Sequence, residues 1–472
     1  MSTYNIPGVT VEEISTFPRS VVQVSTAVPG FIGYTDKVPT SGSLHRITSL
    51  LEFEDLFGGL YSLGYNATSN GLDITLVSNA SGTSVTNVAE IKDKPPFHLY
   101  RSMRLYFANG GGPCWVASAG TYGAATLTAD TQLASALASL SKIDEVTLLV
   151  APDAISLTSA QFKSLSEKML TQCATLKDRF TILDTYEASD YADANTSRGF
   201  YGNNNLSYGA AYFPFLNTDE VYADDQVTIK VHTGGAGTHE SADFEGETIA
   251  DILGLTGTAN EDLRDRILPE IRRMVAANPI SVPPSGAIAG VMCAVDRDRG
   301  VWKAPANVSL TAITGPRTKL TENNYGNLNV DTNSGKSINA IRTFTGKGDL
   351  VFGARTLNGA SNAWRYVPVR RLFITVEESI AKATAFSVFE PNDANTWSKL
   401  KAMIENYLAG LWRQGALAGP TPEQSFFVNV GLGSTMTPND ILEGRLIIEV
   451  GIAAVRPAEF IILKFSHKLQ EA

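Results

Sequence analysis

The sequence has few cysteines and no long run of apolar residues. Its three cysteines, Cys114, Cys173 and Cys293, are odd in number and far apart, so no disulfide framework and no CxxC metal site is readable. No run of about 18 apolar residues indicates a membrane-spanning helix. Residues 1–20 also lack the basic start and the apolar core of a secretory signal. We therefore expect buried reduced thiols and a chain that folds in water, without direct membrane insertion.

The sequence also lacks complete signatures of catalysis. GKS at residues 335–337 ends like a phosphate-binding loop, but Val330 stands where the first glycine is needed. The glycine-rich segments 110–113 and 234–239 do not fit a dinucleotide fingerprint, and no G-x-S-x-G occurs. The five histidines lie at least seven residues apart, which excludes a histidine metal cluster within one element. We predict no catalytic residue, no metal site and no cofactor.

The most suggestive polar cluster is DRDRG at residues 296–300. Asp296 and Asp298 are two carboxylates, the residue type that acts as a pair in general acid–base catalysis. Each of them, however, is adjacent to an arginine, which favours a local ion-pair network in a turn.

Charge of one sign is concentrated in a single window. Residues 219–270 contain thirteen acidic and three basic residues, and their net charge of −10 equals that of the whole chain. Such a block is typical of a solvated, exposed insertion, and without a basic patch elsewhere we expect no nucleic-acid binding. A second polar stretch, residues 65–94, is rich in Ser, Thr, Asn and Gly with short β-branched runs, which predicts a small β insertion.

The first half of the chain alternates strand-like and helix-like segments. The 472 residues are 43% hydrophobic, enough for a substantial core divided among about three domains. This alternation predicts crossover connections and a mainly parallel α/β sheet. The strand-like segments are 114–119, 145–153, 179–186 and 208–216, and the helix-like segments are 128–143 and 158–176.

The last third predicts one long amphipathic helix over residues 395–412. Apolar residues recur at helical spacing on one face, and Lys399, Asn406 and Arg413 repeat every seven residues on the other. Two strand-like runs follow, 445–455 and 458–468, separated by Pro457, which cannot donate in a central ladder. The extended segments at the start and at the end of the chain have no evident partner within it.

An ordered series of long blocks resembles the contractile tail sheath proteins, the family of phage tail sheaths and of sheaths of phage-like injection particles. The blocks are YNIPGVTVEEIS, VSTAVPGFIGYT, VPPSGAIAGVMCAVDRDRGVWKAPAN, INAIRTFTGKGDLVFGARTL, WRYVPVRRLFITVEESI, LWRQGALAGPTPEQSFFV and GRLIIEVGIAAVRPAEFIILKFS. They cover residues 4–36 and about 280–468, and weaker similarity lies at 103–116 and 146–153. The two polar insertions depart from any shared pattern.

The resemblance implies a structural sheath subunit. Such subunits stack as helically arranged hexameric rings around an inner tube, and contraction from a metastable extended state drives the tube through a target envelope. In the family, an N-terminal arm and a C-terminal strand are exchanged between neighbouring subunits, which gives unpaired strand edges a partner. The matching arm positions here are Val9, Val11, Glu13, Ile14, Phe460, Ile461, Ile462, Leu463 and Phe465.

The resemblance also implies that a helix late in the C-terminal domain faces the inner tube. The 395–412 helix is the best candidate, with Lys399, Asn406 and Arg413 as tube-facing residues. A solvated polar face is the alternative interpretation of these three positions. Flexible linkers around residues 17–24 and 453–457 would keep the exchanged arms connected while the bodies move.

We therefore expect a mixed α/β (α+β) chain of six segments. They are residues 1–20 (N-terminal arm), 21–64 with 281–456 (core sheath domain), 65–95 (small β insertion), 96–218 (α/β middle domain), 219–280 (acidic outward insertion) and 457–472 (C-terminal arm). Expected partners are further copies of the chain, an inner tube protein, and baseplate and terminal cap proteins. We expect assembly in the bacterial cytoplasm and release on lysis. The alternatives are a non-contractile filament or tube protein and, more distantly, an α/β enzyme.

Overall fold

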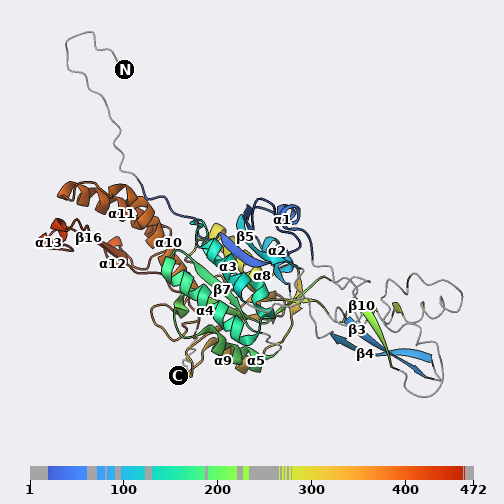
Figure 1. Ribbon diagram of the computed structural model, residues 1–472. Helices are drawn as coiled ribbons and strands as arrows, with labels where there is room; N and C mark the ends of the chain where they lie inside the picture. Colours follow the sequence, from blue (N-terminus) through green and yellow to red (C-terminus); the bar gives the residue numbers. More distant parts are fainter. Residues whose placement is uncertain are drawn as a thin grey trace, which may run out of the picture. The chain divides into compact units, whose positions relative to one another are not determined.

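The computed structural model describes most of the chain as two compact units (Figure 1). The described residues are 20–60, 72–79, 82–90, 97–122, 130–186, 190–220, 227–232, isolated positions between 253 and 277, 279–460 and 462. The larger unit comprises Ser25–Ile374 and Arg456–Ala472, and the smaller one comprises Met1–Val24 and Thr375–Val455. The six segment boundaries expected from the sequence stay predictions.

A nine-stranded sheet lies at the centre of the larger unit, in the order β12-β15-β14-β8-β7-β6-β1-β5-β2. Its six central strands run parallel: β14 (Ile338–Phe344), β8 (Gly209–Phe213), β7 (Phe180–Asp184), β6 (Leu148–Val150), β1 (Pro29–Thr35) and β5 (Cys114–Thr121). Antiparallel strands flank them: β15 (Gly348–Val351) and β12 (Val308–Ser309) at one edge, β2 (Leu44–Ile47) at the other. The predicted mainly parallel α/β sheet is confirmed.

Helices cover both faces of this sheet (Figure 1). Side chains alternate along β1: Phe31 packs in one core cluster and Ile32 in the other. Both faces are buried, which explains why the parallel strands read as apolar runs. One face is covered by α1 (Leu50–Phe57), α2 (Leu99–Ala108) and α8 (Ser285–Arg299), and the other by α3 (Thr131–Leu140) and α4 (Ser159–Leu176).

Two glycines of α8 allow it to lie directly against α2. A Cβ at Gly290 would lie 2.4 Å from the backbone oxygen of Tyr106, and one at Gly286 would lie 2.5 Å from that of Ser102. Atoms that belong to the backbone cannot move away as a flexible side chain can. Glycine is therefore required at both positions for the observed approach of the two helices.

The strands of the two polar insertions form one sheet. The antiparallel strands β3 (Leu72–Asn79) and β4 (Gly82–Glu90) come from the first insertion. β10 (Val227–His232), from the acidic window, pairs parallel with β3. Two insertions that lie far apart in the sequence therefore share one sheet, in the order β10-β3-β4.

Short elements complete the larger unit. A second three-stranded sheet has the order β11-β9-β13. The remaining elements are β9 (Leu216–Thr218), β11 (Ser281–Val282), β13 (Ile313–Pro316), α5 (Tyr191–Thr196) and α9 (Glu322–Asn329). Helix α10 (Val367–Thr384) begins in the larger unit and ends in the smaller one.

The smaller unit is built around the predicted long helix, which is confirmed as α11 (Ala394–Arg413). Asp393 caps it by accepting a hydrogen bond from the backbone nitrogen of Thr396 at 2.9 Å. The predicted apolar face is buried through Leu400, Ile404, Leu408 and Leu411. The other elements are α12 (Pro422–Ser425), α13 (Pro438–Leu442) and the antiparallel strands β16 (Phe426–Val430) and β17 (Ile448–Ile452).

Candidate functional site at the roots of the two arms

Two buried carboxyl groups are the first candidates for chemistry, and both are structural. Burial raises the pKa of Asp153 and that of Asp184 to about 7. Asp153 accepts hydrogen bonds from the backbone nitrogens of His98 and Leu99 at the start of α2, at 2.5 and 3.0 Å. Asp184 accepts bonds from the backbone nitrogen and hydroxyl of Ser285 at the start of α8, at 2.9 and 2.6 Å. Their exposed fractions are 0% and 4%, so both acids position helices and neither is accessible to a substrate.

Other candidate chemical groups are enclosed as well. The three cysteines are buried free thiols. Lys336, in the GKS segment, is 5% exposed, and its ammonium donates a 2.9 Å hydrogen bond to the backbone oxygen of Arg198. Among the residues that the structure describes, no group of His, Cys, Asp and Glu has the arrangement of a metal site. No described helix is long and apolar enough to cross a bilayer.

Glu459 fixes the chain at the start of the expected C-terminal arm. Arg355 Nε donates to both oxygens of this carboxylate, at 2.9 and 3.1 Å, and Nη2 donates at 2.6 Å. The amide of Asn329 and the hydroxyl of Tyr366 donate at 2.6 and 3.0 Å. Burial alone would raise the pKa of Glu459, but the hydrogen bonds and the charge of Arg355 outweigh it, so the pKa is lowered.

Two side chains that follow Glu459 are apolar and exposed. Phe460 is 69% exposed and Ile462 is 78% exposed. Large apolar side chains in such exposed positions, next to a fixed residue, are typical of a surface that another partner covers. Neither residue is in a strand in the structure. The other predicted residues of this arm, Ile461, Leu463 and Phe465, lie outside the described residues.

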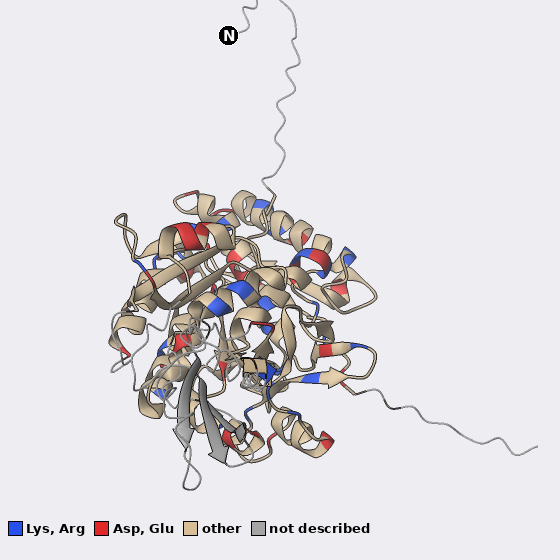
Figure 2. Ribbon diagram, turned by 90° about the vertical axis from the view of Figure 1, so that its right-hand side faces the viewer, with Lys and Arg blue, Asp and Glu red and all other residues tan. Residues whose placement is uncertain are grey.

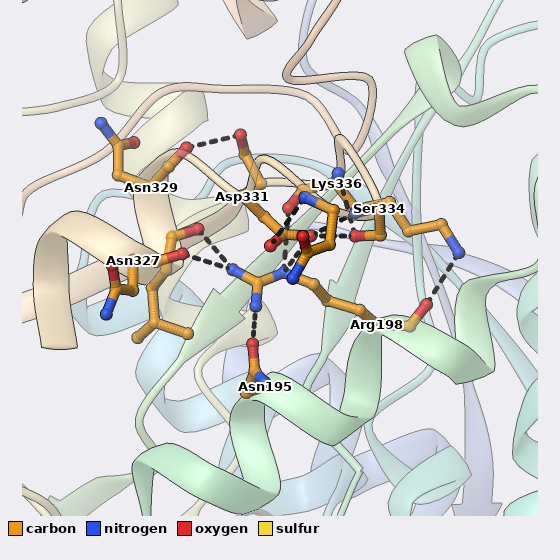
Figure 3. Close-up of polar contacts among 10 residues, drawn as sticks. Asn195, Arg198, Asn327, Asn329, Asp331, Ser334 and Lys336 are labelled. Carbon is orange, nitrogen blue, oxygen red and sulfur yellow. Dashed lines mark hydrogen bonds and ion pairs between the residues drawn. The ribbon is translucent and has the colours of Figure 1, made fainter.

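A buried arginine holds the last turn of α9, which carries Asn329 (Figure 3). Arg198 is 4% exposed and donates to the backbone oxygens of Asn327, Leu328 and Lys336 at 2.8, 3.0 and 2.9 Å. It also bonds to the side chain of Asn195, and Asp331 lies 3.9 Å away. Burial lowers the pKa of Arg198 and that of Lys336.

The segment that follows α9 is tied back to Asn329 itself. The hydroxyl of Ser337 donates a 2.6 Å hydrogen bond to the backbone oxygen of Asn329. Arg198 and Lys336 therefore keep residues 327–337 in place, and through Asn329 they support the root of the C-terminal arm. From the sequence alone, this segment is recognisable only as an incomplete phosphate-binding loop.

The root of the N-terminal arm is held by a second buried ion pair. Arg371 binds Asp296 through two hydrogen bonds of 2.9 and 2.5 Å, and both side chains are 3% exposed. Arg371 also donates to the backbone oxygen of Thr26 at 2.8 Å. The backbone nitrogen of Val28 donates to Thr147 Oγ1 at 2.8 Å. Residues 26–28 are thus fixed to the body just before β1.

This geometry corrects the interpretation of DRDRG. The segment forms the last turn of α8 rather than a turn between elements. Arg297 does pair with Asp298, at 3.1 Å on the surface. The partner of Asp296, however, is 75 residues away in α10, and adjacency in sequence could not predict it. The predicted residues of the N-terminal arm, Val9, Val11, Glu13 and Ile14, lie outside the described residues.

Local sequence patterns do not mark the anchoring residues, which are Asn329, Arg355, Tyr366, Arg371 and Glu459. A usable signal was present in VPVRRLFITV, where two adjacent arginines interrupt an apolar helix. Buried arginines require a carboxylate or equivalent acceptors. Arg370 is the first of the pair. Its guanidinium carbon lies over the rings of Tyr208 and Trp364, 3.9 and 4.6 Å from their centroids.

The first two residues of the acidic window, Asp219 and Glu220, are charge-paired. Glu220 binds Arg101 at 2.9 Å and Arg104 at 3.3 Å, and it is next to Asp219. Figure 2 shows acidic and basic positions interspersed along the described ribbon. The start of this insertion is therefore attached to α2 by ion pairs.

The smaller unit has an incomplete sheet and an exposed helix face. Within the described residues, β16 and β17 form a sheet of two strands only. Phe427 and Ile447, at this sheet, are 49% and 41% exposed. Lys399, Asn406 and Arg413 are all exposed on α11 at seven-residue spacing. Their role at an inner tube stays a prediction.

Comparisons with known proteins identify the class. The model of the phage tail sheath C-terminal domain matches residues 360–468. The tail sheath protein of Vibrio phage KVP40 is 25% identical over 185 residues, which are 39% of this chain and 26% of that protein. The tail sheath protein of Salmonella phage ViI is 29% identical over 143 residues, 29% of this chain and 21% of that protein. These matches span about a quarter of the length of the curated relatives.

Solved structures match over the whole chain. The sheath of the PVC extracellular contractile injection system in its contracted state is 30% identical, with 99% of both chains covered and a TM-score of 0.65. The helical sheath of the anti-feeding prophage, also contracted, is 30% identical, with 99% of this chain and 100% of that chain covered and a TM-score of 0.63. The fold is that of a contractile sheath subunit. The chain belongs to the contractile tail sheath protein family, and it is a structural component of a phage tail or phage-like injection particle rather than an enzyme.

Proposed function

We propose that copies of this chain stack as helically arranged hexameric rings around an inner tube and contract from a metastable extended state. Contraction drives the tube through a target envelope. The observation that carries this proposal is the contrast at the C-terminal root. Glu459 is held by Arg355, and the next residue, Phe460, is 69% exposed. A fixed base followed by an exposed apolar segment suits a strand that is donated to another copy.

The two-stranded sheet of the smaller unit is the proposed acceptor. A two-stranded sheet alone is marginally stable, and its open edges offer unpaired backbone groups. Segments 9–14 and 460–465 of neighbouring copies would add strands at the edges of β16 and β17. The period-two placement of Val9, Val11 and Glu13 puts their side chains on one face of such a strand.

Rigid bodies joined by exchanged strands provide a mechanism for contraction. Repeated head-to-tail contacts that do not close into a ring generate a helical filament. The body of each subunit moves as a unit, while the linkers at 17–24 and 453–457 keep the strands connected. A small preference of each subunit for the contracted packing adds up over the whole lattice.

The other proposed partners are the inner tube, baseplate and terminal cap proteins of the same particle. Lys399, Asn406 and Arg413 would face the inner tube, where Lys399 and Arg413 would pair with acidic residues. A baseplate structure of the anti-feeding prophage contains a chain 30% identical to this one, which supports contact with baseplate proteins. Terminal cap proteins would complete the sheath. Assembly in the bacterial cytoplasm and release on lysis complete the proposal.

Electron microscopy of the purified chain, with and without a cognate tube protein, tests this function. We expect wide, striated hollow cylinders that shorten and widen on triggering. Cylinders that keep a constant length under every triggering condition would favour the non-contractile filament. Single dispersed subunits at every concentration, with tube protein present, would contradict the proposal.

A further inference from the structure

A fully exposed phenylalanine lies just before α11. Phe389 has a relative exposure of 104%, and its neighbour Val388 is 63% exposed. The backbone of Phe389 is left-handed, with φ of +71°, which is unfavourable for a bulky residue. The surrounding structure therefore holds this side chain outward against a local preference.

The turn that presents Phe389 is well held within the smaller unit. The backbone nitrogen of Glu390 donates to the backbone oxygen of Ser387 at 3.1 Å. Asn392 accepts a 2.7 Å bond from the indole of Trp397 and donates a 3.0 Å bond to the backbone oxygen of Arg445. Phe389 is thus a projecting group on a fixed base.

A groove lies further along the same helix. It has a volume of about 330 Å³. Residues along one side of α11 line it, together with Ser20, Val21 and Gln23. The apolar part of its lining comprises Val21, Met403, Tyr407, Gly410 and Leu411, and the polar part comprises Ser20, Gln23, Asn406 and Gln414. Asn406 is the one proposed tube-facing residue that borders this groove. The volume is ample for one aromatic side chain.

Gly410 opens this groove at a cost to the helix. A glycine within a helix is less favourable than alanine. A Cβ at Gly410 would meet nothing within 4 Å, so packing inside the subunit does not require the glycine. Its absence of a side chain instead leaves the groove clear.

We propose that the groove beside Gly410 receives Phe389 of a second copy of this chain. Phe389 is fully exposed, so it does not occupy the groove of its own subunit. The projecting group precedes the helix and the groove lies in its second half. From Ala394 to Gly410 the helix rises about 24 Å, which keeps the two surfaces apart. Two different surfaces that fit one another form a heterologous contact, and such contacts propagate along a polymer.

This contact rests on the proposed polymerisation and adds a specific interface to it. It joins the smaller units of adjacent copies without either arm. The interface is therefore testable in full-length chains whose arms are intact.

Cysteine cross-linking in the assembled full-length chain tests the contact. One preparation carries Phe389→Cys, a second carries Gly410→Cys, and the two are mixed before assembly and mild oxidation. We expect disulfide-linked dimers from the mixture and a ladder from the double variant. The matched control mixes Gly410→Cys with Leu442→Cys, since Leu442 is 84% exposed in the same unit. The native cysteines are buried.

Each outcome decides between the alternatives. If microscopy shows cylinders but the dimer yield of the mixture does not exceed that of the Leu442→Cys control, this contact is wrong and the proposed function still stands. Dimers from Phe389→Cys alone, at the yield of the mixture, would indicate a contact of Phe389 with itself and would also overturn it. Absence of cylinders from the unmodified chain would contradict the proposed function and this contact together.

Two substitutions at Gly410 provide a second measurement. Alanine and leucine both favour the helix, so both variants should fold with unchanged or raised melting temperature. Only leucine fills the groove. We expect the critical concentration for assembly to rise at least about tenfold for Gly410→Leu, equivalent to about 1.4 kcal/mol. Normal assembly of Gly410→Leu would contradict the contact.

Discussion

Arg355 and Glu459 lie 104 residues apart in the chain, yet the guanidinium of the first contacts both carboxylate oxygens of the second. The arginine comes from the body and the glutamate from the segment that leads into the C-terminal arm. This pair fixes Glu459 to the body of its own subunit, next to the segment that we propose is donated to another copy. A sheath that transmits force through exchanged strands needs a base of this kind.

Removing the arginine should destabilise the body more than neutralising the glutamate. Arg355→Ala leaves a carboxylate that is only 18% exposed without its cation, and we expect a loss of about 3 kcal/mol or more. Glu459→Gln keeps one acceptor oxygen but leaves the buried Arg355 without its counter-charge, so it should cost about 2 kcal/mol. Urea unfolding of both variants measures the difference. Equal stability of Arg355→Ala and the unmodified chain would show that the pair anchors nothing.

The contribution of Glu459 should depend on pH with a definite sign. Its pKa is lower in the folded chain than the ordinary value of 4.5. The stabilisation is therefore present above pH about 4.5 and is lost as the pH falls through the folded pKa. The stability difference between the unmodified chain and Glu459→Gln should shrink below pH about 4. A difference that grows on acidification would have the wrong sign.

Asp184 should show the opposite pH dependence. Burial raises its pKa to about 7, so the folded chain holds a proton that the unfolded chain releases near pH 4. Its contribution is greatest below pH about 4 and declines as the pH rises towards 7. Asp184→Asn should flatten this decline in unfolding experiments between pH 4 and 7. An unchanged slope in the variant would exclude Asp184 as its source.

The contact between α2 and α8 predicts a strong glycine effect. Gly290→Ala places a methyl group 2.4 Å from the backbone oxygen of Tyr106, so the helices must separate, at a cost of about 1–3 kcal/mol. The control is Gly326→Ala in α9, where a Cβ meets nothing within 4 Å. That change should be neutral or stabilising by up to about 1 kcal/mol. Thermal unfolding of the two variants compares them directly, and similar melting temperatures would contradict the proposed role of Gly290.

The face of α11 that we propose to contact the inner tube gives a charge prediction. Lys399→Glu combined with Arg413→Glu should weaken assembly on the tube, because both cations become anions opposite the acidic residues proposed there. Lys401→Glu, elsewhere on α11, is the matched control. Sedimentation of sheath with tube protein measures assembly. Equal assembly of the double variant and the control would show that these residues lie on a solvated face and do not contact the tube.

Local patterns predicted the regular parts of this chain and could not predict its long-range pairs. The alternation of apolar strands with helices located β5 to β8, and the 3.6-residue spacing located α11, because both signals are contained within one element. The pairing of β10 with β3 joins residues from two distant insertions, and no local period records it. The partners of Asp296 and Glu459 were missed for the same reason. Buried ion pairs are set by the tertiary fold, which brings Arg371 and Arg355 to them.

Cryo-electron microscopy of the assembled sheath, traced through residues 1–20 and 457–472, tests the central claim most directly. The account predicts that segments 9–14 and 460–465 add strands beside β16 and β17 of other copies, while Glu459 remains on Arg355 of its own copy. A matched sample lacking residues 1–15 should contain folded bodies without a connected sheath. Both segments folded back onto the subunit they come from, in a sheath that still assembles and contracts, would contradict the account.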